Sequence, residues 1–508
     1  MSTAHRVIKN TGFLYAKMGI TVFISLYTTR LVLNALGASD FGIFNLVGGA
    51  IAMLGFMHAA MSSATQRFMS YYEGRGDMEK QKYIFNVSSV LHFGIAIALI
   101  LILLLAGYFF FNGVLNIPAD RVFAAKVIYG SLILSTAFTV MSVPYEAVLN
   151  AHENMLYYSI VGILESMLKL AVALFIVSYA GDKLVLYGIL MAVIPFITRT
   201  IMQVYCHKKY PECIIAPKRY FEKGLMKEMT SFAGWSFLGT AVAMLTSYGQ
   251  GILLNMFFGT KINAAHGIAV QANGQINVFS YNMMKALTPV IVKSEGKGNR
   301  NKMLQASFMG SKLAYYLLAF FAIPIIIEMP YIFELWLKNV PEYAIVFTRL
   351  ILMSSMITQL MSTIAVSIDA TGKIKELQIV KSLVEAMPLF VAYILFKLGY
   401  TPTYLYIVML IMTFVRSFGV LLYYAKKEVG LNVAEFLKQV MLPVGIVTLI
   451  ALGFAVLPHF YMNYGAYRLF SVFLVYFPVF LLALWFIGFN KHEKGIVAGL
   501  LKRILKQK

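Results

Sequence analysis

Two short polar stretches decide the fold of this chain: Glu73-Gly74-Arg75-Gly76-Asp77-Met78-Glu79-Lys80 and Glu295-Gly296-Lys297-Gly298-Asn299-Arg300-Asn301-Lys302. They match in residue type at most positions, and each ends one hydrophobic run and begins the next. Further matches share an offset of roughly 220 residues, which marks an internal repeat. They include Glu165 with Glu385 and Arg199 with Arg416. The sequence therefore predicts two homologous halves, an arrangement typical of transporters, followed by an unpaired remainder.

The composition is that of an integral membrane protein. The chain has 508 residues, of which 60% are hydrophobic and 13% are charged, and a soluble domain carries about twice that charged fraction. We expect about fourteen apolar runs of about 20 residues, each long enough to cross a bilayer as a helix. The alternating pattern of an outer-membrane barrel is absent. The first run contains Lys17 and Arg30 and lacks a cleavage site, so it predicts a first span and not a cleaved signal.

The net charge of +21 is explained by topology. Lys and Arg concentrate in alternate loops, which the positive-inside rule assigns to the cytoplasm, and both termini then lie inside. Nucleic-acid binding is not expected, because no aromatic and basic platform is visible. Cys206, His207 and Cys213 do not have the spacing of a zinc site. We expect no metal and no cofactor.

The two repeats predict the organisation of the chain. An even number of spans separates them, so the halves share one orientation and a pseudo-twofold axis along the membrane normal. The predicted parts are an N-lobe of spans 1–6 (1–206), a basic amphipathic linker (207–229), a C-lobe of spans 7–12 (230–424), an extra helix pair (425–489) and a basic amphipathic cytoplasmic tail (490–508).

The linker and the tail share a pattern. In the linker, Tyr220, Leu225 and Met229 recur at helical spacing among lysines. In the tail, Ile496, Leu500 and other apolar residues do the same. Both patterns predict interfacial helices that lie on the inner leaflet and bind anionic lipids.

A longer stretch carries a family resemblance: Thr29-Arg30-Leu31-Val32-Leu33-Asn34-Ala35-Leu36-Gly37-Ala38-Ser39-Asp40-Phe41-Gly42-Ile43-Phe44. It resembles the first-span signature of the polysaccharide transporters, the O-antigen flippase-like branch of the multidrug/oligosaccharidyl-lipid/polysaccharide (MOP) superfamily. The six-plus-six arrangement with a terminal pair fits this family over essentially the whole length. The resemblance implies an all-α, MATE-like membrane fold of two pseudo-symmetric lobes.

The resemblance also implies a function. Such proteins are bacterial inner-membrane flippases and not enzymes. They move an undecaprenyl-pyrophosphate-linked oligosaccharide from the cytoplasmic to the periplasmic leaflet by alternating access. The glycan is an O-antigen, capsule or exopolysaccharide repeat unit, as in lipopolysaccharide biosynthesis. Expected partners are this lipid-linked glycan, membrane lipids and polysaccharide polymerase machinery.

Basic residues in the spans are the candidate substrate ligands. A charge at membrane depth is costly unless it is hydrated or paired, so each one is a functional candidate. A pyrophosphate needs cationic donors, and Arg offers a planar fork where Lys offers a point charge. The cationic-cavity candidates are Lys17, Arg30, Lys285, Arg67 and Arg349. The alternatives are snorkelling to an interface and, for Arg67 above all, a positive-inside anchor.

Two glutamates in the spans have a lysine four residues away. Glu165 precedes Lys169, and Lys381 precedes Glu385. Pairs at this spacing can neutralise themselves within one helix. We therefore expect structural pairs, with cavity-lining or a cation-coupling role as the alternative.

Other function classes are weighed by what the sequence lacks. A cation-coupled multidrug exporter of the same superfamily needs a buried carboxylate. No Asp or Glu lies between Asn10 and Ser39, around span 1, or between Met229 and Phe258, around span 7. That exporter stays open as the alternative, because an acid elsewhere could serve. A glycan polymerase or ligase is disfavoured, since the longest predicted outer loop is short.

Overall fold

The computed structural model describes residues 3–52, 55–114, 118–337, 340–491 and 493–495, with side chains for most of them. Within these residues the chain is helical and no strand occurs. The helices are α1 (Thr3–Ala52), α2 (Gly55–Arg75), α3 (Met78–Phe109), α4 (Val122–Ala151), α5 (Met155–Ser178), α6 (Lys183–Lys209), α7 (Lys223–Gly296), α8 (Arg300–Leu337), α9 (Ala344–Thr371), α10 (Lys375–Lys397), α11 (Thr403–Phe414), α12 (Leu422–Val429), α13 (Val433–Phe436), α14 (Leu442–Tyr461) and α15 (Ala466–Ala483).

Most of these helices have membrane-spanning length. Twelve segments of the described chain are long and apolar enough to cross a bilayer. Two of the helices, α1 and α7, each consist of two helices joined at a kink, at Gly37 and at Gly259, where the backbone is not helical. The two breaks fall at corresponding positions of the repeats. The all-helical, multi-pass membrane fold expected from the sequence is confirmed.

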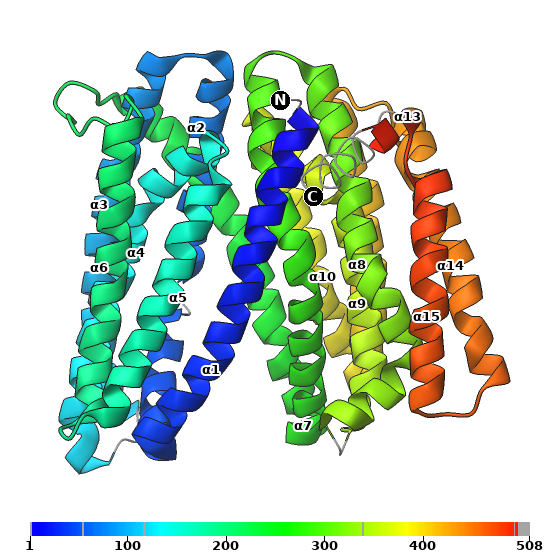
Figure 1. The fold of residues 1–508 in the computed structure, drawn as a ribbon, viewed down its shortest axis with the longest axis horizontal. Helices are drawn as coiled ribbons and strands as arrows, with labels where there is room; N and C mark the ends of the chain where they lie inside the picture. Colours follow the sequence, from blue (N-terminus) through cyan, green and yellow to red (C-terminus); the bar gives the residue numbers. More distant parts are fainter. Residues whose placement is uncertain (1–2, 53–54, 115–117, 338–339, 492, 496–508) are drawn as a thin grey trace, which may run out of the picture. The chain divides into compact units, whose positions relative to one another are not determined.

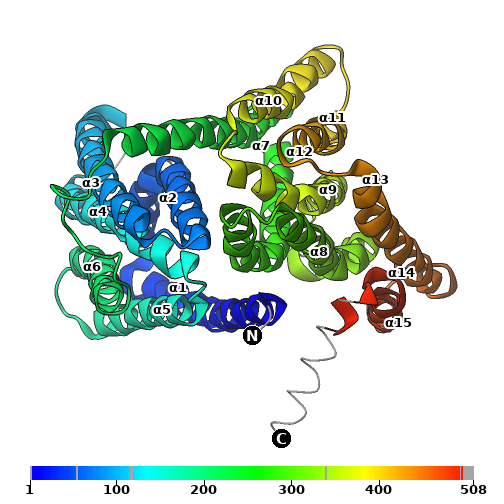
Figure 2. The same ribbon diagram turned by 90° about the horizontal axis from the view of Figure 1, so that it is seen from above.

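The chain divides into two compact units. The first unit is Lys9–Phe237, and the second contains the described residues from Leu238 onward together with those before Lys9. In the first unit α4 packs against α2, α3, α5 and α6. In the second unit α8 packs against α9, α14 and α15. Figure 1 shows the helices of each unit side by side, and Figure 2 shows them end-on. The lobe limits at 206 and 230 stay predictions.

The repeated polar stretch is a helix–turn–helix connection. Gly76 and Gly298 end one helix with φ of 72° and 70°, a left-handed conformation that glycine adopts without a Cβ clash. The next residue caps the following helix. Asp77 accepts a hydrogen bond from the Lys80 amide at 2.9 Å, and Asn299 accepts one from Lys302 at 3.0 Å. The motif recurs because both units need the same turn and the same N-cap.

The linker corrects one prediction. Residues 210–222 form turns and irregular chain, not an interfacial helix, and α7 begins at Lys223. The side chain of Asn86, on α3, donates to the carbonyl of Ile214 at 2.7 Å and accepts from the amide of Ala216 at 2.8 Å. Tyr220 is buried and packs edge-on against Tyr83. Leu225 and Met229 are buried on α7, so the helical spacing holds from Lys223 onward and fails before it.

The tail prediction falls mostly outside the described residues, which end at 495. The first residues of the tail, which the structure does describe, are fixed to the second unit. Glu493 pairs with Lys312 of α8 at 2.6 Å, and both side chains are buried. Near the other end of α8, Arg468 of α15 pairs with the fully buried Glu328 at 2.9 Å. The helix pair α14–α15 is therefore attached to α8 by two buried ion pairs of opposite polarity.

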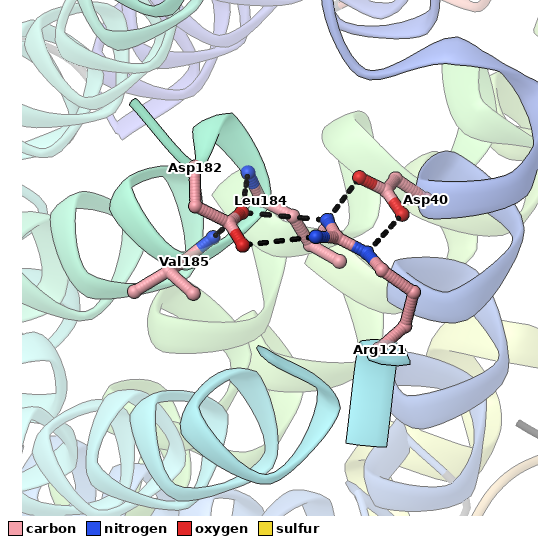
Figure 3. A network of polar contacts seen from close by, with 5 residues as sticks. All are labelled: Asp40, Arg121, Asp182, Leu184 and Val185. Carbon is pink, nitrogen blue, oxygen red and sulfur yellow. Dashed lines mark hydrogen bonds and ion pairs between the residues drawn. The ribbon is translucent and has the colours of Figure 1, made fainter. Parts of the chain in front are cut away.

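One arginine connects three elements of the first unit (Figure 3). Arg121, at the start of α4, binds both carboxylate oxygens of Asp40, with its Nε 2.9 Å from Oδ1. The same guanidinium donates to Asp182 at 2.9 Å. Asp182 also caps α6 by accepting from the amides of Leu184 and Val185. Arg121 thus fixes the start of α4 and of α6 to the segment after Gly37.

Candidate functional site

Each unit contains a polar cavity between its own membrane-spanning helices. The cavity of the first unit has a volume of about 100 Å³, and that of the second about 250 Å³. The two glutamates that the repeat pairs, Glu165 and Glu385, line one cavity each. Thr139 and Thr358 also lie one in each. The internal repeat therefore places polar groups at comparable positions in both units.

Four helices supply the cavity of the first unit. Lys17 comes from α1, Glu146 from α4, Tyr158 and Glu165 from α5, and Thr198 from α6. The Lys17 ammonium lies over the Tyr158 ring, 4.3 Å from its centroid, in cation–π geometry. Glu146 accepts a hydrogen bond from Ser142 at 2.9 Å. The result is a small chamber with one amine and two carboxylates.

A glycine makes room for the amine. Gly162 lies on α5 in the cavity wall, and a Cβ added there would overlap the end of the Lys17 side chain. One turn further, Glu165 is 2.6 Å from Lys169, as the spacing of four predicted. Lys169 is not part of the cavity lining. Lys17 is therefore positioned by the space at Gly162 and by an aromatic face, in a cavity that two carboxylates also line.

In the second unit the basic group of the cavity lining is a guanidinium. Arg416 donates to Glu385 at 3.0 Å and to Thr358 at 3.0 Å. The prediction that Lys381 pairs with Glu385 is therefore wrong. The base that binds Glu385 is Arg416, which comes from another helical segment. Arg416, which the sequence favours as a topological anchor, lies in the cavity wall. Packing of neighbouring helices brought it there, and no spacing within one helix could show this.

Amide and hydroxyl groups complete the second cavity. Asn273 accepts from Ser355 at 2.8 Å, and Gln250 and Ser354 lie beside them. The second oxygen of Glu385 and the hydroxyl of Ser354 are buried and have no hydrogen-bond partner among the described atoms. Both groups line the cavity, where ordered water could satisfy them.

The remaining basic candidates have different surroundings. The Arg30 side chain lies outside the described part of the structure. Arg67 is buried in the first unit, with its guanidinium over the rings of Phe68, Tyr71 and Phe232 at 4.6–5.3 Å. Lys285 is half-buried on α7 and has interactions of its own. Their role as phosphate ligands stays a prediction.

Arg349 has a structural role in the described residues. Its Nε donates to the carbonyl of Ile326 at 2.9 Å, and Nη2 lies 3.4 Å from the carbonyl of Ile327. The residue four positions after Ile326 is Pro330, inside α8, and a proline has no amide to donate. Arg349 therefore supplies the hydrogen bond that the helix lacks at this point.

Sequence reasoning missed Glu146, Tyr158 and the cavity position of Arg416. For Glu146 a signal exists, since it is an acid two residues after Pro144 within an apolar run. Tyr158 is one of 31 tyrosines, so composition could not single it out.

Comparisons with known proteins agree with this architecture. Residues 7–295 match the family described as polysaccharide biosynthesis protein. The uncharacterized membrane protein EpsK of Bacillus subtilis is 21% identical over 308 residues, which are 59% of this chain and 59% of EpsK. The chain thus matches less than two thirds of the length of that curated relative.

Three solved structures show the same fold. An outward-facing multidrug resistance MATE family transporter of the MOP superfamily superposes with a TM-score of 0.69 at 15% identity, over 85% of this chain and 96% of its own. A MOP superfamily transporter from Pyrococcus furiosus, described as having a binding pocket of reverse polarity, gives 0.68 at 15% identity, over 85% and 98%. The Vibrio cholerae MATE transporter VcmN in its bent form gives 0.67 at 17% identity, over 85% and 98%.

Proposed function

This chain belongs to the polysaccharide biosynthesis protein family, and on that premise we propose that it is a flippase for lipid-linked oligosaccharides. Its substrate would be an undecaprenyl-pyrophosphate-linked glycan, moved from the cytoplasmic to the periplasmic leaflet of a bacterial inner membrane. The observation that carries the proposal is the family match, which covers more than half of the chain. The MOP-type transporter fold supports membrane transport and leaves the substrate open.

The alternative is a cation-coupled exporter of small amphipathic compounds. The fold shared with MATE transporters favours it. Such an exporter needs a carboxylate that binds a cation. In this chain Glu165 and Glu385 each have a basic partner, Lys169 and Arg416. These pairs favour the flippase over the exporter.

The substrate ligands proposed for the flippase are Arg30, Lys285 and Arg67. A charge-assisted hydrogen bond to phosphate contributes about 1.5–3 kcal/mol, so loss of one ligand is expected to slow transport at least about tenfold. The Arg349 side chain is occupied with backbone carbonyls, so it is not included among these ligands. Lys17 is a predicted ligand whose surroundings favour another role, argued in the next subsection.

Purified protein in proteoliposomes provides the test. A polyprenyl-pyrophosphate oligosaccharide is included in the vesicles, and its exposure on the outer leaflet is followed with an impermeant glycosidase. We expect transport by the wild type and an at least about tenfold slower rate in Arg30→Gln and Lys285→Gln. The matched control is Lys302→Gln, an exposed lysine of the repeated turn.

One result would contradict the flippase, and another would contradict only its proposed ligands. One is wild-type protein that leaves the glycan lipid in place and instead exports a small cationic dye when a proton or sodium gradient is imposed. The other is normal glycan transport in the Arg30 and Lys285 double variant, which would remove the phosphate ligands from the scheme while leaving the flippase itself.

A further inference from the structure

The charges at the first-unit cavity balance. Lys17 contributes one positive charge, and Glu146 and Glu165 contribute two negative charges. Glu165 is paired with Lys169 at 2.6 Å. Lys17 is then the basic residue that shares the cavity lining with Glu146, and the four groups sum to zero. Balance matters here because an uncompensated charge among apolar helices is costly.

The cavity is shaped around the end of Lys17. The ammonium faces the Tyr158 ring at 4.3 Å, and the missing Cβ of Gly162 leaves the space that the side chain fills. An aromatic face next to carboxylate and hydroxyl oxygens is a set of groups that binds a small cation. In this protein the Lys17 ammonium, which belongs to α1, occupies this cavity.

We propose that Lys17 is a built-in counter-ion, which occupies from within the chain the site where a free sodium ion or proton would otherwise bind. The first unit then has no need to take up a cation from solution. In the second unit the repeat-related Glu385 and Thr358 bind Arg416, whose repeat partner in the first unit is Arg199 and not Lys17. The proposal concerns how the unit balances its charge, and it holds whether the substrate is a glycan lipid or a small compound.

Other ionisable groups near the cavity do not replace Lys17. On α6, Arg199 follows the lining residue Thr198 in the sequence and is not itself part of the lining. On α4 the neighbour of Glu146 is Tyr145, which is buried. On α5 they are Tyr158 and Lys169. Among the lining residues Lys17 is the basic one, so its removal should leave the cavity with the charges of its carboxylates and no lining amine.

The direct test removes the charge and keeps the shape. Lys17→Met is purified in detergent, and its melting midpoint is measured in sodium chloride and in choline chloride, at neutral and at acid pH. A cation that binds the folded state raises the midpoint, by about 2 °C or more when it is well above its dissociation constant. We expect this sodium or acid stabilisation in Lys17→Met, relative to wild type under the same conditions, and no sodium effect in the wild type.

A second variant displaces the amine and leaves it in the chain. Gly162→Ala places a methyl group where the Lys17 side chain lies, so it should acquire the same cation dependence. Two matched controls should behave as wild type. Lys126→Met removes an exposed lysine of α4, and Gly130→Ala adds a methyl group at a site with no neighbour within 4 Å.

The outcomes separate cleanly. Stabilisation by sodium assigns the vacated site to a metal cation, and stabilisation by acid alone assigns it to a proton; both support the proposal. Variants that fold only with sodium or only in acid support it as well. Three results overturn it: variants whose sodium and pH responses equal those of wild type, variants that fail to fold under every condition, or a wild type that sodium itself stabilises.

Discussion

At the scale of single residues, Arg349 illustrates how a charge in a span can serve the backbone. Its guanidinium donates to the carbonyl of Ile326. Pro330, four residues later in α8, has no amide hydrogen to donate to that carbonyl. A buried carbonyl left without a partner costs about 1–3 kcal/mol. A basic residue in a transporter helix is therefore not sufficient to identify a substrate ligand.

This explanation predicts a coupled pair of substitutions. Arg349→Met should destabilise the protein by about 1–3 kcal/mol, because the carbonyl of Ile326 loses its donor. Pro330→Ala restores a backbone amide at the fourth position and should recover part of that loss in the double variant. Melting midpoints of the single and double variants give the comparison. Strict additivity of the two effects would contradict the explanation.

At the scale of elements, the first unit depends on side chains that join helix ends. Arg121 binds Asp40 and Asp182, and so connects three segments that are far apart in the sequence (Figure 3). Burial raises the pKa of the Asp182 carboxyl. The hydrogen bonds from the Val185 and Leu184 amides and from Arg121, together with the charge of Arg121, lower the pKa by more than burial raises it. The net pKa of Asp182 is therefore below its usual value.

A lowered pKa makes this contact sensitive to acid. The folded state binds the proton of Asp182 less readily than the unfolded state. The stabilisation is therefore fully present above the unfolded pKa and is lost as pH falls through the folded pKa. Asp182→Asn keeps an N-cap for α6 and removes the charge. Because the Asp182 side chain is 39% exposed, we expect a loss of no more than about 1 kcal/mol at neutral pH.

Melting midpoints over a pH series test this prediction. The difference between wild type and Asp182→Asn should be largest at neutral pH and should shrink toward acid pH. A difference that stays constant from neutral to acid pH would mean that the charge of Asp182 contributes nothing to the contact.

At the scale of the molecule, α14–α15 are an integral part of the second unit. Their ion pairs with α8, Lys312–Glu493 and Arg468–Glu328, lie 16 residues apart on α8 by its own numbering, which is about 24 Å along the helix. Between them the Tyr476 hydroxyl donates to the carbonyl of Ala319 at 2.7 Å. Opposite charges at the two ends fix both the position and the direction of the pair.

Removing one partner of a buried pair should be costly. Arg468→Met leaves Glu328 buried without its guanidinium, and we expect a loss of about 3–5 kcal/mol. Arg468→Met with Glu328→Gln removes both charges and should cost less than the single change. Melting midpoints and limited proteolysis of α14–α15 measure this. A double variant no better than Arg468→Met would show that the ion pair is not what holds the helices.

The sequence by itself determined the helical membrane fold, the internal repeat and the repeat-related glutamates. These features follow from apolar length, turn residues and spacing, all of which are properties of neighbouring residues in the chain. It also determined the Glu165–Lys169 pair, because both residues share one helix.

Only the tertiary structure decided the partners that come from other helices. Glu385 binds Arg416 and not Lys381. Lys17 lies in the space left by Gly162. The segment 210–222 is hydrogen-bonded to α3 through Asn86. Each of these depends on how a helix is rotated about its axis and which neighbour it faces. Packing over the whole unit sets that rotation, and no local pattern in the sequence records it.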